Sequence, residues 1–305
     1  MLQKEKYGKR LVPIVTPFKE DMSVDYDALL QIGEILIERD YADSFILTGT
    51  TGEFFTMNYD ERVKIFEMMK KHFGSRIPLI PHTGAASTME ALALTRKAKE
   101  LGYDLVMIVA PYYTKPSPKE LVNHFSIIAD SVDVDIMLYN IPIFTGVNIE
   151  PTNLKELIKK KNIVAIKEEA ELRPKQMSEY LLATPDNFIV YCGDDTMVLE
   201  ALAQGGNRIG GFVSGGCHLF GDRMKNMINL FLSGDVIEAG KIQLSLLPLL
   251  RSLTQNGRNN PVCLLKGAMN LIGYPKCLPR LPLMPATPVE MELVKDKMKQ
   301  LGMLP

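Results

Sequence analysis

Short apolar segments alternate with amphipathic helical patterns along most of the chain. The apolar segments are rich in β-branched residues and are bounded by turn residues, so each predicts a buried strand of a parallel sheet. A strand–helix unit that recurs every ~28 residues, eight times over, predicts a (β/α)8 barrel of the TIM type and therefore an α/β fold. No Gly-x-Gly-x-x-Gly turn follows the first segment, which argues against an open dinucleotide-binding sheet. The predicted strands lie at 11–15, 45–48, 77–81, 105–109, 136–139, 163–166, 188–191 and 209–213.

Helical patterns fill the gaps between these strands, and more of them follow the last strand. The helices between strands are predicted near 26–38, 59–73, 88–101, 118–130, 152–160, 174–183 and 195–204, and the later ones near 219–232, 235–253, 261–272 and 288–301. The first late helix completes the barrel, and the others form an appendage. We therefore expect a catalytic barrel domain over 1–233 and a C-terminal helical extension over 234–305 that packs on it.

The composition argues against several classes of protein. The 305 residues carry a formal net charge of -1, so no basic excess is available to hold a nucleic-acid backbone. No apolar run is long enough to span a bilayer, and the N-terminus lacks the apolar core of a secretory signal. The four cysteines and four histidines show no metal-binding spacing. We expect a cytoplasmic protein that uses neither a metal nor another cofactor and binds neither nucleic acid nor membranes.

A lysine lies at the carboxyl end of a predicted strand. Lys167 closes an apolar run and shares a face with Ile163 and Ala165, because side chains alternate along a strand. An inward lysine loses hydration, which favours the neutral amine that can attack a ketone and form a Schiff base. The alternative is a lysine at the strand edge that extends to water. Active sites of such barrels lie at the carboxyl ends of the strands, so the other strand ends test these two interpretations.

Hydroxyl groups gather at those other strand ends. The second strand is followed by Gly-Thr-Thr-Gly-Glu at 49–53, whose backbone amides and threonine hydroxyls suit a small carboxylate. Tyr112 and Tyr113 follow the fourth strand, and Tyr139 ends the fifth. Aromatic residues at strand ends are usually packing residues. Three phenols and two threonine hydroxyls at a barrel mouth that also holds Lys167 indicate a proton relay instead.

Several short motifs occur in a fixed order along the chain. They are GTTGE at 49–53, PYYTKP at 111–116, LYNIPIFTG at 138–146, VAIKE at 164–168, GDD at 193–195 and LPL at 281–283. With these motifs the chain resembles the pyruvate-dependent class I aldolase and lyase family that includes the dihydrodipicolinate synthases and N-acetylneuraminate lyases. The resemblance implies a Schiff-base-forming enzyme that acts on pyruvate or a related 2-oxo acid. It also implies a homotetramer, built as a dimer of dimers.

The resemblance assigns roles to individual residues. Lys167 matches the lysine that forms the Schiff base with the 2-oxo carbon, and Tyr139 matches the phenol that moves protons to and from the enamine. Thr50 and Tyr113 match the hydrogen-bonded partners of that phenol. The second tyrosine of the pair, Tyr113, reaches in from, or lies against, the neighbouring subunit in this family. The pocket for the pyruvate carboxylate is matched by Gly49, Thr50 and Thr51.

Three positions depart from the family pattern and bear on the second substrate. Phe144 replaces an arginine that binds the carboxylate of the aldehyde in dihydrodipicolinate synthases, so we expect a less charged acceptor. Glu169 belongs to an acidic run that would repel a dicarboxylate and hydrogen-bond a polyhydroxylated acceptor, unless the run is a solvated helix start paired with Arg173 or Lys175. Gly210 replaces a bulkier residue, and the lost volume either enlarges the pocket or accommodates Phe212 elsewhere.

Three functions remain open at this point. The first is a dihydrodipicolinate synthase-like lyase or aldolase acting on pyruvate or a related 2-oxo acid together with an aldehyde. The second is an aldolase or dehydratase for 2-keto-3-deoxy sugar acids. The third is a sensor that binds 2-oxo acids without reaction. A sensor would need the carboxylate pocket but not the proton relay, so the residues favour an enzyme.

Overall fold

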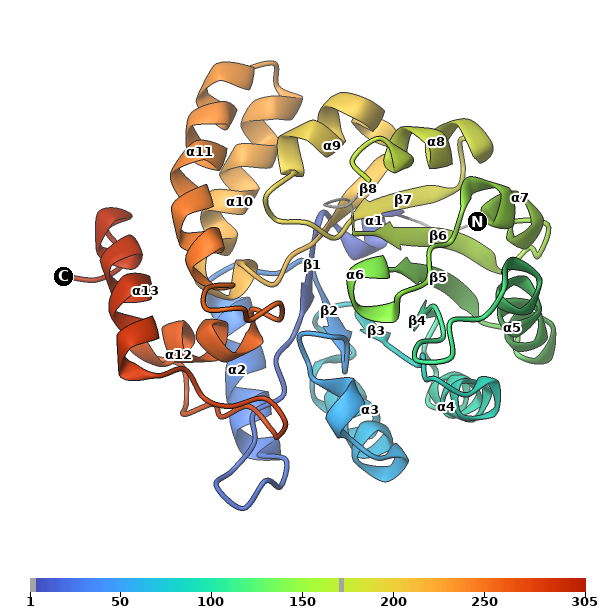
Figure 1. Cartoon of the computed structure of the whole chain (residues 1–305), viewed down its shortest axis with the longest axis horizontal. Coiled ribbons are helices and arrows are strands. Elements are labelled where there is room, and N and C mark those ends of the chain that lie inside the picture. The colour runs from blue at the N-terminus through green and yellow to red at the C-terminus, as the bar shows by residue number, and fades with distance from the viewer. Residues whose placement is uncertain (1–3, 170–172) are drawn as a thin grey trace.

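Within residues 4–169 and 173–305, which the computed structural model describes, eight parallel strands form one sheet (Figure 1). Their order is β3-β2-β1-β8-β7-β6-β5-β4. A parallel bridge between His82 and Met107 links the two ends of this order and nearly closes the ring. The strands are β1 (Arg10–Pro13), β2 (Ser44–Leu47), β3 (Leu79–Pro81), β4 (Leu105–Val109), β5 (Asp135–Asn140), β6 (Ile163–Glu168), β7 (Ile189–Cys192) and β8 (Ile209–Val213). The predicted (β/α)8 barrel is confirmed.

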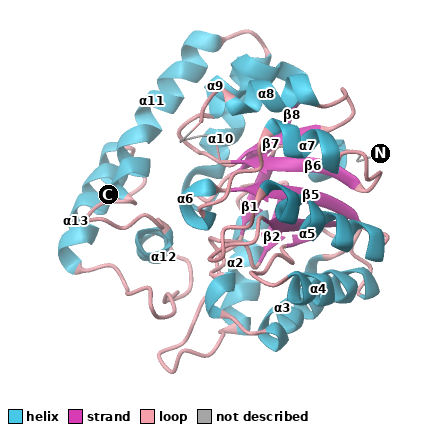
Figure 2. Ribbon diagram, turned by 45° about the vertical axis from the view of Figure 1, so that its right-hand side comes forward, coloured by secondary structure: helices cyan, strands magenta, loops and turns pink. Residues whose placement is uncertain are grey.

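Helices surround the strands on the outside of the barrel (Figure 2). They start where the sequence provides caps: the Ser117 hydroxyl accepts the backbone N–H of Glu120 beside Pro118, which favours a helix start. The barrel helices are α2 (Tyr26–Glu38), α3 (Tyr59–Phe73), α4 (Thr88–Glu100), α5 (Pro118–Ser131), α7 (Pro151–Leu157), α8 (Gln176–Ala183), α9 (Val198–Gly205) and α10 (Cys217–Leu232). Shorter helical pieces are α1 (Lys4–Tyr7), η1 (Phe54–Thr56), α6 (Pro142–Thr145) and η3 (Gly206–Arg208).

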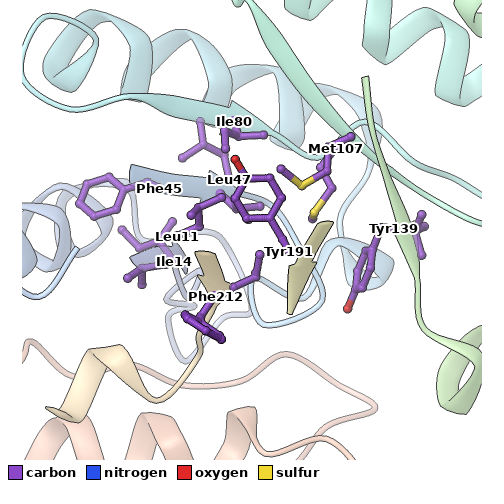
Figure 3. Close-up of a cluster of buried hydrophobic side chains, with 14 of the residues drawn as sticks. Leu11, Ile14, Phe45, Leu47, Ile80, Met107, Tyr139, Tyr191 and Phe212 are labelled. Atoms are coloured by element: carbon purple, nitrogen blue, oxygen red, sulfur yellow. The ribbon is translucent and has the colours of Figure 1, made fainter. Parts of the chain in front are cut away.

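The interior of the barrel is filled by apolar side chains from several strands (Figure 3). Leu11, Leu47, Ile80 and Met107 are buried there, and the ring of Tyr191 lies among them. A barrel of this size is a packed core rather than a channel. Because the core fills the interior, space for a ligand is left at the carboxyl ends of the strands, where the loops diverge.

The helices after α10 complete the molecule: α11 (Val236–Ser252), α12 (Val262–Leu271) and α13 (Pro288–Gln300). They lie beside the barrel on the side of α10 (Figure 1). Lys266 of α12 is fully buried and donates hydrogen bonds to the backbone oxygens of Thr16, at 2.6 Å, and Leu278, at 2.9 Å. It also forms an ion pair with Glu53, whose side chain is equally buried. The extension is therefore tied to the loop that follows β2.

Candidate active site

Lys167 lies at the carboxyl end of β6, in register with Tyr139 of β5 and Tyr191 of β7. Only 6% of the lysine is exposed, and that part lines a cavity of about 410 Å³. Its Nζ lies 4.0 Å from the centre of the Tyr139 ring and 3.8 Å from the Oε2 of Glu169. The lysine is thus an inward nucleophile candidate, because its amine does not extend to bulk water.

The charge on this amine is set by opposing effects. Burial disfavours the ammonium form, but the neighbouring oxygens of Tyr139 and Glu169 favour it, and the pKa of Lys167 ends above its usual value. Only the neutral amine attacks a carbonyl carbon. The site therefore needs a group that removes a proton from Lys167 before reaction.

The hydroxyl groups of Tyr139 and Thr50 lie close together. The phenol oxygen of Tyr139 and the Oγ1 of Thr50 are 3.4 Å apart. Burial raises the pKa of Tyr139, so the phenol keeps its proton at neutral pH and acts as a donor. Thr50 and Thr51 both line the cavity, and they follow β2 in a tight turn in which Thr48 has a φ of 50°. A Cβ atom added at Gly49, in the same turn, would lie 3.8 Å from the Cε of Met107.

Tyr113 is not at the mouth of its own barrel. Its side chain is 91% exposed and its backbone has a φ of 72°, a left-handed conformation that is uncommon for a tyrosine. The prediction that three phenols converge on one barrel mouth is wrong for Tyr113 within a single chain. The preceding Tyr112 is half-buried and lines an adjoining chamber instead. The left-handed backbone at Tyr113 sends the two neighbouring rings to different places.

Three carboxyl groups lie on the β7 side of the amine. Glu169, Asp194 and Asp195 all line the cavity. Burial raises the pKa of Glu169 to about 8 and that of Asp195 to about 6. Asp194 accepts the backbone N–H and the hydroxyl of Thr196, and Asp195 accepts the backbone N–H of Gly216. One oxygen of each aspartate is buried without a hydrogen-bond partner among the described residues.

Glu169 does not fit the alternative interpretation, in which the acidic run is a solvated start of a helix. Only 18% of its side chain is exposed, and Arg173 pairs with Glu150 instead, at 2.9 Å. Arg208 donates to the backbone oxygens of Leu181 and Thr184, before the start of β8, and lines none of the cavities described here. Neither arginine therefore replaces the positive charge that an arginine at position 144 would offer to the carboxylate of an aldehyde. Glu171, the last acid of the run, lies outside the described residues.

Gly210 does not enlarge the substrate cavity. It is the second residue of β8 and does not line the cavity that contains Lys167. A Cβ atom added there would lie 2.2 Å from Ile189 and 2.8 Å from the ring of Tyr191. The interpretation of Gly210 as a substrate-binding residue is therefore wrong: the missing side chain leaves room for the Tyr191 ring inside the barrel. The alternative, that it accommodates Phe212, names the wrong aromatic residue.

Phe144 belongs to α6, a single turn of helix after β5 that the sequence patterns did not predict. Its side chain is 41% exposed and lines both the Lys167 cavity and an adjoining chamber of about 450 Å³. The chamber walls are mostly apolar and aromatic. They include Phe54, Phe55, Tyr112, Ile141 and Leu283. Phe144 thus separates a polar cavity from an apolar one.

The C-terminal extension contributes cavity walls that sequence reasoning missed. Asn259 and Asn260 line both spaces, and Arg251 of α11 lines the Lys167 cavity. No strand end or motif marks these positions. Only the return of the extension across the barrel mouth brings them there.

The described residues contain neither a cluster of His, Cys, Asp and Glu that could hold a metal ion nor a helix long and apolar enough to cross a membrane.

Comparison with known proteins agrees with this geometry. The family model of the dihydrodipicolinate synthetase family matches residues 6–301. The chain is 38% identical to a 4-hydroxy-tetrahydrodipicolinate synthase of Desulforamulus reducens, over 98% of each chain. It is 39% identical to the enzyme of that name from Acetivibrio thermocellus, over 96% of this chain and 97% of that one.

Solved structures show the same fold. The dihydrodipicolinate synthase of Cyanidioschyzon merolae with lysine bound superposes with a TM-score of 0.90 at 33% identity, over 98% of this chain and 99% of that one. The chloride-inhibited enzyme of Acinetobacter baumannii complexed with pyruvate gives 0.89 at 30% identity, over 98% and 100%. The chain belongs to the dihydrodipicolinate synthetase family and is a pyruvate-dependent lyase of the Schiff-base-forming class.

Proposed function

We propose that Lys167 forms the Schiff base with the 2-oxo carbon of pyruvate or a related 2-oxo acid. The observation that carries this proposal is a buried amine on a cavity wall, 4.0 Å from the centre of the Tyr139 ring. The positive imine withdraws electrons from the neighbouring carbon, which then loses a proton to give an enamine. Tyr139 and Thr50 transfer that proton, and Thr50 and Thr51 with the backbone of Gly49 hold the carboxylate of the 2-oxo acid.

A second copy of the chain completes the relay in this proposal. Tyr113 is matched by a relay tyrosine in the family pattern, yet 91% of it is exposed in one chain. Its phenol therefore acts in the site of a neighbouring subunit, within a homotetramer built as a dimer of dimers. The four cysteines are buried and free, which fits the reducing cytoplasm as the place of action.

The structure supports an acceptor aldehyde with hydroxyl groups and without a second carboxylate. Phe144 offers no hydrogen-bond donor, and Arg173 and Arg208 are held elsewhere. Glu169 and Asp195 line the cavity beside the amine, where their oxygens can accept hydrogen bonds from hydroxyl groups. A 2-keto-3-deoxy sugar acid, cleaved by an aldolase or dehydrated through the same imine, has this chemistry.

The activity of the relatives is the main candidate by overall similarity, and the sugar-acid reaction is the alternative to it. Eight similar proteins, at 36–39% identity, are all 4-hydroxy-tetrahydrodipicolinate synthases. For this chain to share that activity, a cation other than residue 144 would have to hold the aldehyde's carboxylate. Arg251 lines the Lys167 cavity, and Arg258 lines the adjoining chamber with Phe144 but forms an ion pair with Glu290. A sensor that binds without reaction is disfavoured, because it has no use for the contact between Tyr139 and Thr50.

Borohydride trapping tests the imine. Pyruvate with sodium borohydride should add the mass of a reduced adduct to the peptide that contains Lys167, and Lys167→Ala should remove the adduct. Lys175→Ala, which changes a lysine in the same region outside the cavity, should leave the yield unchanged. An adduct of full yield in Lys167→Ala would overturn the assignment.

A further inference from the structure

Glu169 is placed against the reacting amine. Its backbone N–H donates to the backbone oxygen of Asn140, at 3.1 Å, which fixes the chain where it leaves β6. Its Oε2 lies 3.8 Å from the Nζ of Lys167. A Cβ atom at Gly193 would lie 2.4 Å from the Cε of Lys167 and 2.9 Å from the Oε2 of Glu169. Glycine at 193 therefore leaves room for both side chains.

Tyr139 and Glu169 flank the amine on opposite sides. Tyr139 comes from β5, and Glu169 lies against Gly193, which follows β7. β6 lies between these two strands. The phenol holds its proton at neutral pH, because burial raises its pKa, and is a poor base there. A carboxyl group on the other flank can accept a proton from the amine, which the phenol does poorly.

Several charged or titratable groups face Glu169. Burial raises its pKa to about 8 against the opposing effect of the Lys167 ammonium group, and the nearby acids raise it further. An acid that titrates close to neutral pH both accepts and donates protons efficiently. The facing groups are Lys167 and Glu168 from β6, Tyr139 from β5, Cys192 from β7, and Asp194 and Asp195 from the loop after β7.

We propose that Glu169 is a second proton-transfer residue for making and hydrolysing the Lys167 imine, which rests on the proposed function above. The carboxylate first removes a proton from the ammonium group. The free amine attacks the 2-oxo carbon, the C=O electron pair moves onto oxygen, and a proton passes from nitrogen to that oxygen to give a carbinolamine.

Glu169 then returns its proton to the carbinolamine hydroxyl. The C–O bond breaks, water leaves, and the nitrogen electron pair forms the C=N bond of the iminium ion. Glu169 ends as a carboxylate beside a positive nitrogen, which stabilises the charge that the reaction creates. One ammonium group and one ketone have become one iminium ion and one water, with Glu169 unchanged.

The test measures imine formation with pyruvate alone, so it does not depend on the acceptor aldehyde. Rapid mixing, a borohydride quench and mass analysis give the rate from pH 6 to pH 10. In the unmodified protein the rate should rise through a midpoint close to the pKa of Glu169, about 8. Glu169→Gln should slow the reaction by roughly 10-fold or more and remove this midpoint. Glu169→Asp should retain a midpoint.

A substitution at a neighbouring acid tests whether nearby charges raise the pKa of Glu169. Asp195→Asn removes a negative charge that raises the pKa of Glu169, so the midpoint should move to lower pH. The new amide oxygen can still accept the N–H of Gly216. Glu156→Gln changes an exposed acid on α7 and should leave both the rate and the midpoint as they are.

The outcomes are distinguishable. An unchanged rate and midpoint in Glu169→Gln, or an unmoved midpoint in Asp195→Asn, overturns the role of Glu169 while the imine mechanism stands. Absence of any adduct in the unmodified protein overturns the proposed function itself. Thermal unfolding of each variant shows whether it folds, and if Glu169→Gln does not, Glu169→Asp and Asp195→Asn decide the question.

Discussion

At the residue scale, the chemistry that we propose depends on single hydroxyl and carboxyl groups, and burial raises the pKa values of Tyr139 and Glu169. Tyr139 is the clearest case, because its ring packs against the amine while its hydroxyl contacts Thr50. The packing and the proposed proton transfer depend on different parts of one side chain, the ring and the hydroxyl group. Removing only the hydroxyl tests the second function and leaves the first intact.

Tyr139→Phe should lower the rate of proton exchange at C3 of pyruvate by on the order of 10²-fold, because one hydroxyl serves the transfer. The exchange is followed by NMR in D₂O and needs no second substrate. Pyruvate binding should weaken far less, since the carboxylate pocket is untouched. Near-normal exchange in the variant would mean that the phenol only fills space.

Phe144 governs the choice of acceptor in our proposal. Loss of a charged donor to a carboxylate typically costs about 10²-fold or more in specificity. We expect the unmodified protein to condense pyruvate with aspartate semialdehyde poorly, and Phe144→Arg to improve that reaction by a similar factor. A side-by-side assay against a hydroxylated, uncharged aldehyde measures both. Efficient use of aspartate semialdehyde by the unmodified protein would point to Arg251 as the replacement cation.

At the scale of elements, the sequence predicted the strands and long helices well and the loops poorly. The predicted strands at 105–109 and 209–213 match β4 and β8 residue for residue, because apolar runs bounded by turns determine them locally. Lys167 and Tyr139 were predicted as site residues from the same signal, since each lies one residue before the end of its strand. The four-residue helix α6 is too short to show a helical period, so it was missed.

Positions set by packing between elements could not be predicted in this way. Whether Gly210 opens a pocket depends on the Tyr191 ring of the neighbouring strand β7, and no single-strand pattern contains that information. The exposure of Tyr113 depends on a left-handed backbone in a loop. Arg251 and the two asparagines reach the cavity only through the path of the extension.

Gly210→Ala should destabilise the protein by about 1–3 kcal/mol, because the added methyl group overpacks the interior against Ile189 and Tyr191. Gly240→Ala is the matched control: it lies in α11, nothing stands within 4 Å of the added atom, and stability should hold or rise slightly. Chemical denaturation measures both. If Gly210→Ala left stability unchanged and altered pyruvate affinity instead, the original interpretation of a substrate-lining glycine would return.

At the scale of the whole molecule, the extension and the barrel share a buried ion pair. Lys266 of α12 meets Glu53, the last residue of the turn that carries Thr50 and Thr51. We therefore propose that residues 234–305 do not form an independent unit but support the carboxylate pocket. The barrel domain over 1–233 would lose this support if expressed alone.

Lys266→Met should cost about 3–5 kcal/mol, because it leaves the Glu53 carboxylate buried without its partner. Lys276→Met removes a lysine from an exposed pair with Glu20 and should cost at most about 1 kcal/mol. Denaturation curves measure the difference, and the pyruvate affinity of Lys266→Met should fall through the displaced threonine turn. Equal stability losses in the two variants would contradict a supporting role for the buried pair.

The assembly itself is testable through Tyr113. If its phenol acts in the site of a neighbour, an intact site needs Lys167 from one chain and Tyr113 from another. Tyr113→Phe and Lys167→Ala homo-oligomers should each exchange the C3 protons of pyruvate slowly or not at all. After the two variants are mixed, unfolded together and refolded, half of the random dimers are mixed, and each contains one intact site. About a quarter of normal exchange activity should therefore return.

The opposite arrangement gives a different result. If Tyr113 serves its own chain, every site in the mixture lacks either the lysine or the phenol, and refolding restores nothing. Refolding each variant alone controls for the recovery of folded protein, and native mass spectrometry verifies that mixed oligomers have formed. Recovered activity in the presence of mixed oligomers would establish that a phenol 91% exposed in one chain belongs to the active site of another, and no recovery would place Tyr113 in the relay of its own chain, together with Tyr139 and Thr50.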